Sequence, residues 1–238
     1  MNDLPPSVEF RRRIDLAFPA MKDAYGRLLS RPDYAEVFPE YGRALYFTIC
    51  ASVPLMESAL RKVHEADASD KLTHYLAPYL ERHIREERHH DEWLLEDLAK
   101  IGYDRDAIYA SGPPFRVAQM VGAQYYWIHH YHPLALFGYI GAIEGYPPTE
   151  EGIQLLNTRH NIPTEALRTA LLHAKLDPIH KDDLDVFLNN LSIPPHLMNL
   201  MCISGISTIS QMCGIYEDLA ESNTRTLMDR APRSVSGA

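Results

Sequence analysis

The chain has 238 residues, 46% hydrophobic and 23% charged, which is enough to bury one sizeable core in an ordinary soluble globular protein. Its formal net charge of −9 argues against nucleic acid or an anionic membrane as a partner. No apolar run approaches the ~20 residues of a membrane span, and the N-terminus, MNDLPPSVEFRRR, lacks the apolar core of a signal peptide. We therefore expect no membrane partner. Cys50, Cys202 and Cys213 show no CxxC spacing, so we expect a reduced, cytoplasmic protein.

Taken in order, the chain predicts an all-α protein. The expected helical segments are 4–30, 31–66, 71–101, 113–146, 163–192 and 196–221. Asp70 is a plausible N-cap for the third segment, and Gly102 follows its end. Pro133 is expected to kink the fourth segment. We expect one domain over residues 1–221, followed by a polar, disordered tail over 222–238.

The segment 163–192 carries a metal-ligand pattern. His173, Asp177 and His180 stand at i, i+4 and i+7, so in a helix they share one face with core residues such as Leu184. Burying these groups costs several kcal/mol unless something pairs with them, and a divalent metal suits imidazole and carboxylate ligands. The competing interpretation is a polar surface run, since charged residues follow at once.

The segment 71–101 offers a second pattern. Glu87 and His90 have the i, i+3 spacing that carboxylate-bridged diiron helical bundles use, and they interrupt an apolar stripe. Glu86 and His89 share this spacing but point about 100° away, toward the charged face. We favour Glu87 and His90, while a surface helix laced with ion pairs remains the alternative.

Two further acids are candidates. Glu144 is the only acid in the apolar segment 113–146, where an unpaired buried carboxylate would normally protonate, so a cation beside it is expected. The alternative is a simple helix-end residue. Glu57 falls on the apolar stripe of segment 31–66. The alternative is that Glu57 lies at the boundary between core and surface and pairs with Arg61.

Together these segments supply three carboxylates and three imidazoles. Six inward-pointing ligands from separate helices favour a dinuclear site over a single zinc, which needs only three or four ligands. Two ferrous ions would leave a net charge of +1, which suits open positions for O2 or an anionic substrate. Iron is redox active and zinc is not, so oxygen activation is the chemistry that such a site suits.

In these motifs the chain resembles the haem-oxygenase-like diiron oxidases and oxygenases, the iron-containing redox enzymes. The resemblance spans about residues 35–221 and lies in the order of the ligands. It implies a compact, single-domain bundle of about seven helices with a central site, which holds two Fe²⁺ ions and takes O2 as co-substrate; a homodimer is typical. The implied metal ligands are Glu87, His90, Glu144, His173, Asp177 and His180.

Variants within this family bear on two more positions. Some members add a Glu from the preceding long helix, and Glu57 matches that position as an extra ligand or a supporting residue. Others place the first Glu seven residues before the His. That position is His83 here, so we expect this variant not to apply.

The expected function is therefore that of an O2-dependent non-haem diiron oxidoreductase acting on a small molecule, an amino acid or amine. N-oxygenation and oxidative C–C or C–H cleavage are the expected reactions. The preference for a polar substrate rests on the residues Tyr125, Tyr126, Trp127, His130 and His132 as pocket lining. One alternative is a metal-free thiaminase-type or cofactor-synthesis enzyme on the same fold, with a cysteine nucleophile; another is a non-catalytic helical binding protein.

Overall fold

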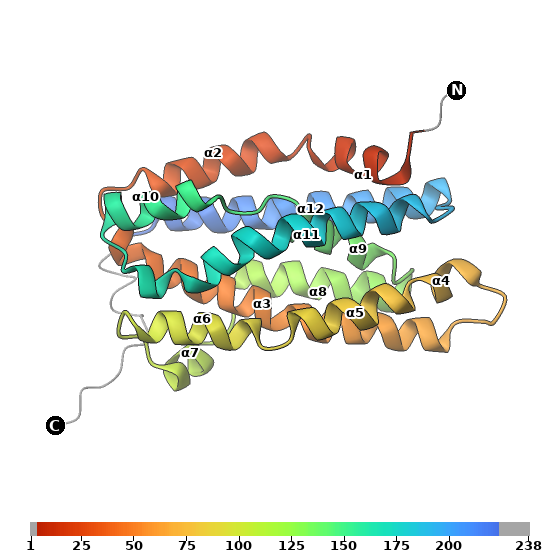
Figure 1. The fold of residues 1–238 in the computed structure, drawn as a ribbon, viewed down its shortest axis with the longest axis horizontal. Helices are drawn as coiled ribbons and strands as arrows, with labels where there is room; N and C mark the ends of the chain where they lie inside the picture. Colours follow the sequence, from red (N-terminus) through yellow and green to blue (C-terminus); the bar gives the residue numbers. More distant parts are fainter. Residues whose placement is uncertain (1–3, 224–238) are drawn as a thin grey trace.

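The computed structural model describes residues 4–223, and within this range the chain forms helices and no strands (Figure 1). The α-helices are α1 (Pro6–Ile14), α2 (Phe18–Leu29), α3 (Tyr34–Glu65), α4 (Lys71–Tyr75), α5 (Ala77–Glu87), α6 (His90–Ala99), α7 (Arg105–Ser111), α8 (Phe115–His130), α9 (Ala135–Ile143), α10 (Glu150–His160), α11 (Arg168–Asn189) and α12 (Pro195–Glu221). A short 3-10 helix, η1 (Thr164–Ala166), precedes α11. The all-α prediction is confirmed.

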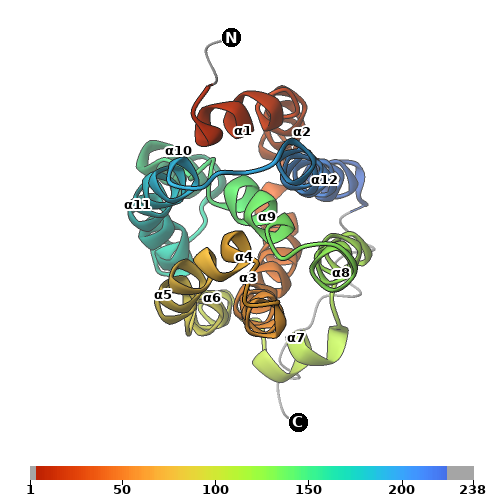
Figure 2. The same cartoon turned by 90° about the vertical axis from the view of Figure 1, so that its right-hand side faces the viewer.

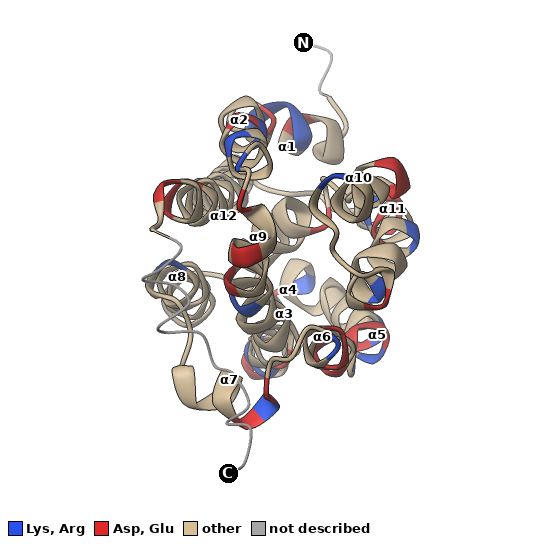
Figure 3. Ribbon diagram, turned by 90° about the vertical axis from the view of Figure 1, so that its left-hand side faces the viewer, with Lys and Arg blue, Asp and Glu red and all other residues tan. Residues whose placement is uncertain are grey.

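The helix α9 lies at the centre of the bundle. Viewed along the long axis, it is surrounded by α12, α8, α3, α5 and α11, while α1 and α2 lie outside on α12 (Figure 2). Its sequence, ALFGYIGAI, is apolar on every side, and a helix of that kind is buried on every side. Charged residues instead occupy the outer helices, including α1, α2, α5 and α11 (Figure 3). Glu144, the residue that follows α9, therefore lies in the protein interior, with a side chain that is only 13% exposed.

A glycine lets α9 and α12 approach backbone to backbone. A Cβ atom built on Gly138 would lie 2.0 Å from the carbonyl oxygen of Met201 and 2.8 Å from the amide nitrogen of Gly205. Contacts this short leave no room for a side chain, so only glycine fits at this crossing. The close approach fixes the position of α9 in the bundle.

Three of the expected helical segments are divided, which raises the number of helices above the expected seven. The segment 4–30 divides into α1 and α2, and Pro19 stands in the first turn of α2. The segment 71–101 divides into α4, α5 and α6, and the break before α6 places His89 in the left-handed region with φ of 73°. The segment 113–146 divides into α8 and α9 around Pro133, which ends a helix where a kink was expected. Asp70 caps α4 as predicted, since its side chain accepts a hydrogen bond from the Thr73 amide.

Two short helices lie in stretches that were expected to be connections. Asp104 caps α7 and Thr149 caps α10, each by accepting a hydrogen bond from the amide three residues later. Both are ordinary N-cap residues, so the capping signal was present in the sequence. Of the expected tail, residues 224–238 lie outside the described part of the chain.

The helix α12 is the one described helix that is long and apolar enough to cross a membrane by length and composition alone, with a mean hydropathy of 1.2 in its most apolar window. Half of that window is buried within the bundle, where α12 packs mainly on α9 and α2. The core helix of a globular protein has the same composition, so this is weak support for a membrane span.

Candidate metal centre

Four segments of the chain bring titratable side chains together inside the bundle. They are His83 and Glu87 from α5, His90 at the start of α6, Glu144 directly after α9, and His173, Asp177 and His180 from α11. His83, Glu87, His90, Asp177 and His180 are buried, and the Glu144 side chain is only 13% exposed. We call these seven residues the central cluster. It contains every predicted metal ligand, together with His83.

Within the central cluster, two donor groups share Glu87. The first group is His83, Glu87, Glu144 and His180; the second is Glu87, His90 and His173. In each group, one ligand atom per residue lies within 4.8 Å of the others. Glu87 Oε2 lies 3.1 Å from His90 Nδ1, whereas its Oε1 lies 3.6 Å from His180 Nδ1. Its two oxygens therefore face different groups, as a carboxylate between two metal ions would.

Hydrogen bonds hold His173 in a metal-binding orientation. Its Nδ1 lies 2.9 Å from the carbonyl oxygen of Thr169, which can only accept a hydrogen bond, so Nδ1 carries the proton and Nε2 is left with its lone pair. The Thr169 amide in turn donates to Asp97 Oδ2 at 2.7 Å. Asp97 on α6 therefore anchors the first turn of α11 and, through it, the histidine.

Glu144 is positioned by contacts at the end of α9. Its Oε1 accepts a hydrogen bond from His83 Nε2 at 2.9 Å. Arg11 on α1 donates from Nη1 to the carbonyl oxygen of Gly141 at 2.8 Å and from Nε to Asp185 Oδ1 at 3.0 Å. These contacts join the C-terminal end of α9 to α11, so the positions of Glu144 and of the candidate ligands on α11 are fixed relative to one another.

Four polar atoms of the central cluster are buried without a hydrogen-bond partner among the described residues. They are His90 Nδ1, His180 Nδ1, Glu144 Oε2 and Asp177 Oδ1. His90 Nδ1 belongs to this set although it lies 3.1 Å from Glu87 Oε2. Each such atom costs about 1–3 kcal/mol when left unpaired. A metal ion would provide the partner that all four lack, and nitrogen and carboxylate donors are suitable for iron.

The pKa values of the central cluster are shifted by burial and by the neighbouring carboxylates. Burial raises the pKa of Asp177 to about 8, and the charges of Glu144 and Glu87 add to the rise. Burial lowers the pKa of His173. At His83, burial acts to lower the pKa, but the neighbouring Glu144 outweighs it and raises the pKa overall. Three carboxylates packed this closely need positive charge between them, which divalent cations would supply.

Comparison with known proteins agrees with this geometry. Residues 55–202, which contain the whole central cluster, match the model of the iron-containing redox enzymes. The chain belongs to this family. The predicted resemblance is therefore confirmed, and the residues fit the iron that the family description implies. Comparison with curated proteins gave no match.

Two solved structures have the same fold as this chain. A domain of unknown function with a heme oxygenase-like fold from Shewanella denitrificans is 16% identical, with a TM-score of 0.74 and 96% of each chain covered. A TenA homolog from Pseudomonas syringae is 12% identical, with a TM-score of 0.64, over 87% of this chain and 92% of the other. At these identities the likeness concerns the fold alone.

The structure does not bring Glu57 to the central cluster. Its side chain is 43% exposed and its Oε1 lies 3.7 Å from Arg88 Nη2. The preceding residue, Met56, is buried, and one step along a helix turns a side chain by about 100°, so Glu57 is carried toward the surface. It pairs with Arg88 rather than with Arg61, the expected alternative partner.

The structure also separates the two candidate Glu–His pairs on the segment 71–101. Glu86 and His89 are exposed, and Glu86 lies 3.8 Å from Arg82. Glu87 and His90 face inward across the helix break. The arrangement therefore favours the pair that was preferred from the apolar stripe.

A small cavity borders the central cluster. It is lined by Ser52, Met56, His83, Leu136, Tyr139, Ile140, Ile143 and Glu144, and its volume of about 10 Å³ is roughly the room that one water needs. None of the five aromatic and histidine residues predicted as pocket lining borders this cavity. Tyr126 and His130 are exposed, and His132 Nε2 lies 2.9 Å from the Thr73 hydroxyl. The apolar part of the cavity wall is formed by Met56, Leu136, Ile140 and Ile143, and the other four lining residues carry polar groups.

The three cysteines are unsuited to nucleophilic catalysis. Burial raises the pKa of Cys50, Cys202 and Cys213, which disfavours the reactive thiolate. None of them borders the cavity beside the central cluster. A cysteine nucleophile was the main expectation of the metal-free alternative.

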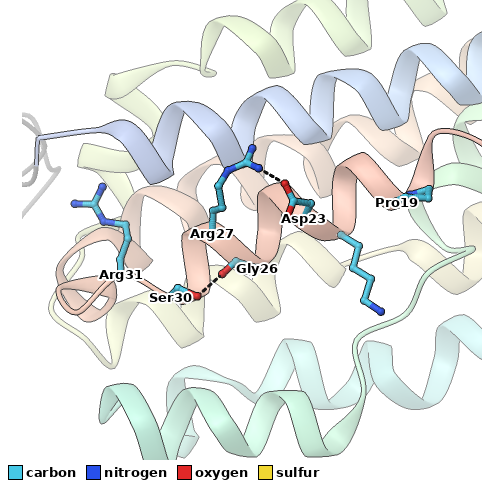
Figure 4. Close-up of a pocket in the computed structure, with 7 residues that line it drawn as sticks. Pro19, Asp23, Gly26, Arg27, Ser30 and Arg31 are labelled. Atoms are coloured by element: carbon cyan, nitrogen blue, oxygen red, sulfur yellow. Dashed lines mark hydrogen bonds and ion pairs between the residues drawn. The ribbon is translucent and has the colours of Figure 1, made fainter.

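A larger and more open groove lies on the outside of α2, between Pro19 and Arg31 (Figure 4). Its Arg27 side chain contacts Asp23 and donates to Glu217 at 2.9 Å, and its Arg31 binds Asp33 and the carbonyl oxygens at the end of α12. These cations are already neutralised, so the groove lacks the concentration of unpaired polar groups that distinguishes the central cluster.

Proposed function

We propose that this iron-containing redox enzyme is a non-haem diiron oxidoreductase that uses O2 to oxidise a small molecule. The observation that supports this most strongly is the pair of buried donor groups that share Glu87. One ion alone would leave one of the two groups without a partner. Two bound Fe²⁺ ions would supply electrons for the reduction of O2.

The ligands in this proposal are the six predicted from the sequence. His90, His173 and Glu87 would hold one ion, and Glu144, His180 and Glu87 would hold the other. Asp177 is buried beside both groups and gives up its proton when cations bind, since cations favour the carboxylate form. Asp97, through Thr169, keeps the His173 ring from rotating away.

The charge balance leaves room for an exogenous ligand. Three carboxylates against two Fe²⁺ ions leave a net charge of +1 on the site, because the imidazoles are neutral when they bind a metal. An anionic group of a substrate, or O2 once it has been reduced, would compensate that charge.

The substrate of the proposed reaction is a small molecule such as an amino acid or amine. The aliphatic walls formed by Met56, Leu136 and Ile140 favour an apolar portion of the substrate next to the cluster. N-oxygenation and oxidative C–C or C–H cleavage both remain reactions of this proposal. With a volume near that of one water, the cavity must widen to admit the substrate.

Anaerobic titration with Fe²⁺, followed by exposure to O2, tests the proposal. We expect two iron ions per chain, a transient visible absorption band after mixing with O2, and O2 consumption. A His173→Ala variant is expected to bind less iron, whereas His64→Ala, which alters an exposed histidine of α3 outside the central cluster, is a control with unchanged binding. Absence of iron binding by the unaltered chain, or equal binding by the His173 variant, would refute the assignment.

A further inference from the structure

His83 is the member of the central cluster that the ligand pattern did not include. It lies on α5 one turn before Glu87, and its side chain is 2% exposed. The spacing of four residues places the two side chains on one face of the helix. Both therefore point toward Glu144 and α11.

The surroundings of His83 leave its Nε2 atom facing the carboxylates. Nε2 lies 2.9 Å from Glu144 Oε1, and it forms part of the four-atom group that includes Glu87 and His180. The ring stacks on Tyr79 at a centroid distance of 5.4 Å and an interplanar angle of 17°, and the His180 ring lies 4.9 Å away. The remaining side faces the cavity. The only polar direction open to Nε2 is thus toward the candidate metal ligands.

Two roles are compatible with this contact. In the first, His83 only orients Glu144 through a hydrogen bond. In the second, Nε2 loses its proton and binds the ion that Glu144 also binds. The second role is favoured by the composition of the group, because without His83 the group offers a single imidazole, His180, beside two carboxylates, whereas the group around His90 already has two imidazoles.

We propose that His83 is a seventh protein ligand of the diiron centre and binds one ion through Nε2; this rests on the proposed diiron function. That ion would be held by His83, Glu144, His180 and Glu87, and the other by His90, His173 and Glu87, with Asp177 beside both groups as the remaining carboxylate. The two ions then have two imidazoles each. The ligand set of this chain is richer in nitrogen than the six-residue pattern indicates.

A neutral ligand at this position has an electrostatic consequence. A carboxylate at residue 83 would make the site one unit more negative, and negative ligands stabilise Fe³⁺ more than Fe²⁺ because the attraction grows with the charge of the ion. His83 therefore favours the ferrous pair. Replacing it with Glu is expected to retain both ions and to lower the reduction potential.

Metal binding by variants of residue 83 tests the proposal. His83→Gln keeps an amide N–H that can donate to Glu144 but removes the imidazole ligand, and His83→Glu supplies a carboxylate ligand instead. His160→Ala is the matched control, because His160 is also buried but lies outside the central cluster. Anaerobic Fe²⁺ titration gives stoichiometry and affinity, and the visible spectrum of Co²⁺ bound in place of iron reports the ligands. Circular dichroism verifies that each variant is folded.

We expect the unaltered chain and His160→Ala to bind two ions, and His83→Gln to bind one of the two at least tenfold more weakly with a changed Co²⁺ spectrum, since changes even to the partners of metal ligands cost 10–100-fold in affinity. Wild-type affinity and an unchanged spectrum in the Gln variant would overturn the assignment of His83 while leaving the diiron function intact. Failure of the unaltered chain to bind Fe²⁺ or Co²⁺ would overturn both proposals.

Discussion

Removing the charge of Asp177 is expected to stabilise the metal-free protein. The Asp177 side chain is buried beside Glu144 and Glu87, and its pKa is raised from 3.8 to about 8 in the folded protein. The folded state therefore retains a proton that the unfolded state releases. Stability of the metal-free protein falls as the pH rises from near 4 to near 8, because folding then requires either holding that proton or burying a carboxylate.

The magnitude follows from the two pKa values. One pKa unit corresponds to 1.36 kcal/mol, and the shift at Asp177 predicts a loss of about 4 kcal/mol in the free energy of unfolding between pH 5 and pH 8. An Asp177→Asn variant keeps the shape of the side chain and removes its ionisation. The difference between the two proteins isolates this effect from the titration of the neighbouring histidines.

Urea unfolding in the presence of a chelator, at several pH values from 5 to 8, measures the difference. We expect Asp177→Asn to gain stability over the unaltered chain as the pH rises. With Fe²⁺ bound, the order should reverse, because bound cations use the carboxylate. Parallel pH profiles of the two metal-free proteins would refute the environment assigned to Asp177.

Three further changes have expected outcomes that follow from the packing. Gly138→Ala should lower the free energy of unfolding by about 3 kcal/mol or more, because overpacking at a backbone crossing cannot relax easily. The control Gly122→Ala has no neighbour within 4 Å of its added Cβ and should stabilise the protein by about 0.5–1 kcal/mol. Equal effects of the two changes in urea unfolding would contradict the α9–α12 crossing. Asp97→Ala should cost about 1–2 kcal/mol and speed hydrogen exchange in the first turn of α11, since Asp97 caps it; unchanged exchange there would argue against this anchor. Loading with Fe²⁺ should slow hydrogen exchange of α11, because bound metal holds its ligands in place. Equal protection of α11 in the metal-free and loaded protein would show that metal binding is not coupled to the mobility of this helix.

Much of the fold was predictable because it depends on local signals. The single long helix α3 was expected over 31–66 and observed over Tyr34–Glu65, and the cap at Asp70 was read from its residue type. The helix break at His89 was not predicted, because no glycine or proline marks it in the sequence.

The central cluster was predictable only in part. The interruption of apolar stripes by histidines and acids identified the candidate ligands, since periodicity fixes which residues of one helix share a face. The same reasoning placed Glu57 on a stripe, but tertiary packing turned that part of α3 so that Met56 faces inward and Glu57 pairs with Arg88. His83 stands at the position where some family members have a Glu ligand, and it was not predicted as a ligand because this chain has a histidine there.

The amino-acid sequence by itself determined the all-helical class and the residues able to hold a metal, because composition and helical spacing are properties of each segment alone, and the order of those residues carried the resemblance to the family. Only the tertiary structure decided that Glu87 lies between two donor groups, that His83 belongs to one of them, and that the cavity beside them has an aliphatic wall. The physical reason is that spacing sets the angles between side chains on one helix. The rotation of each helix about its own axis depends on close contacts such as the one at Gly138, which form only when distant segments pack together.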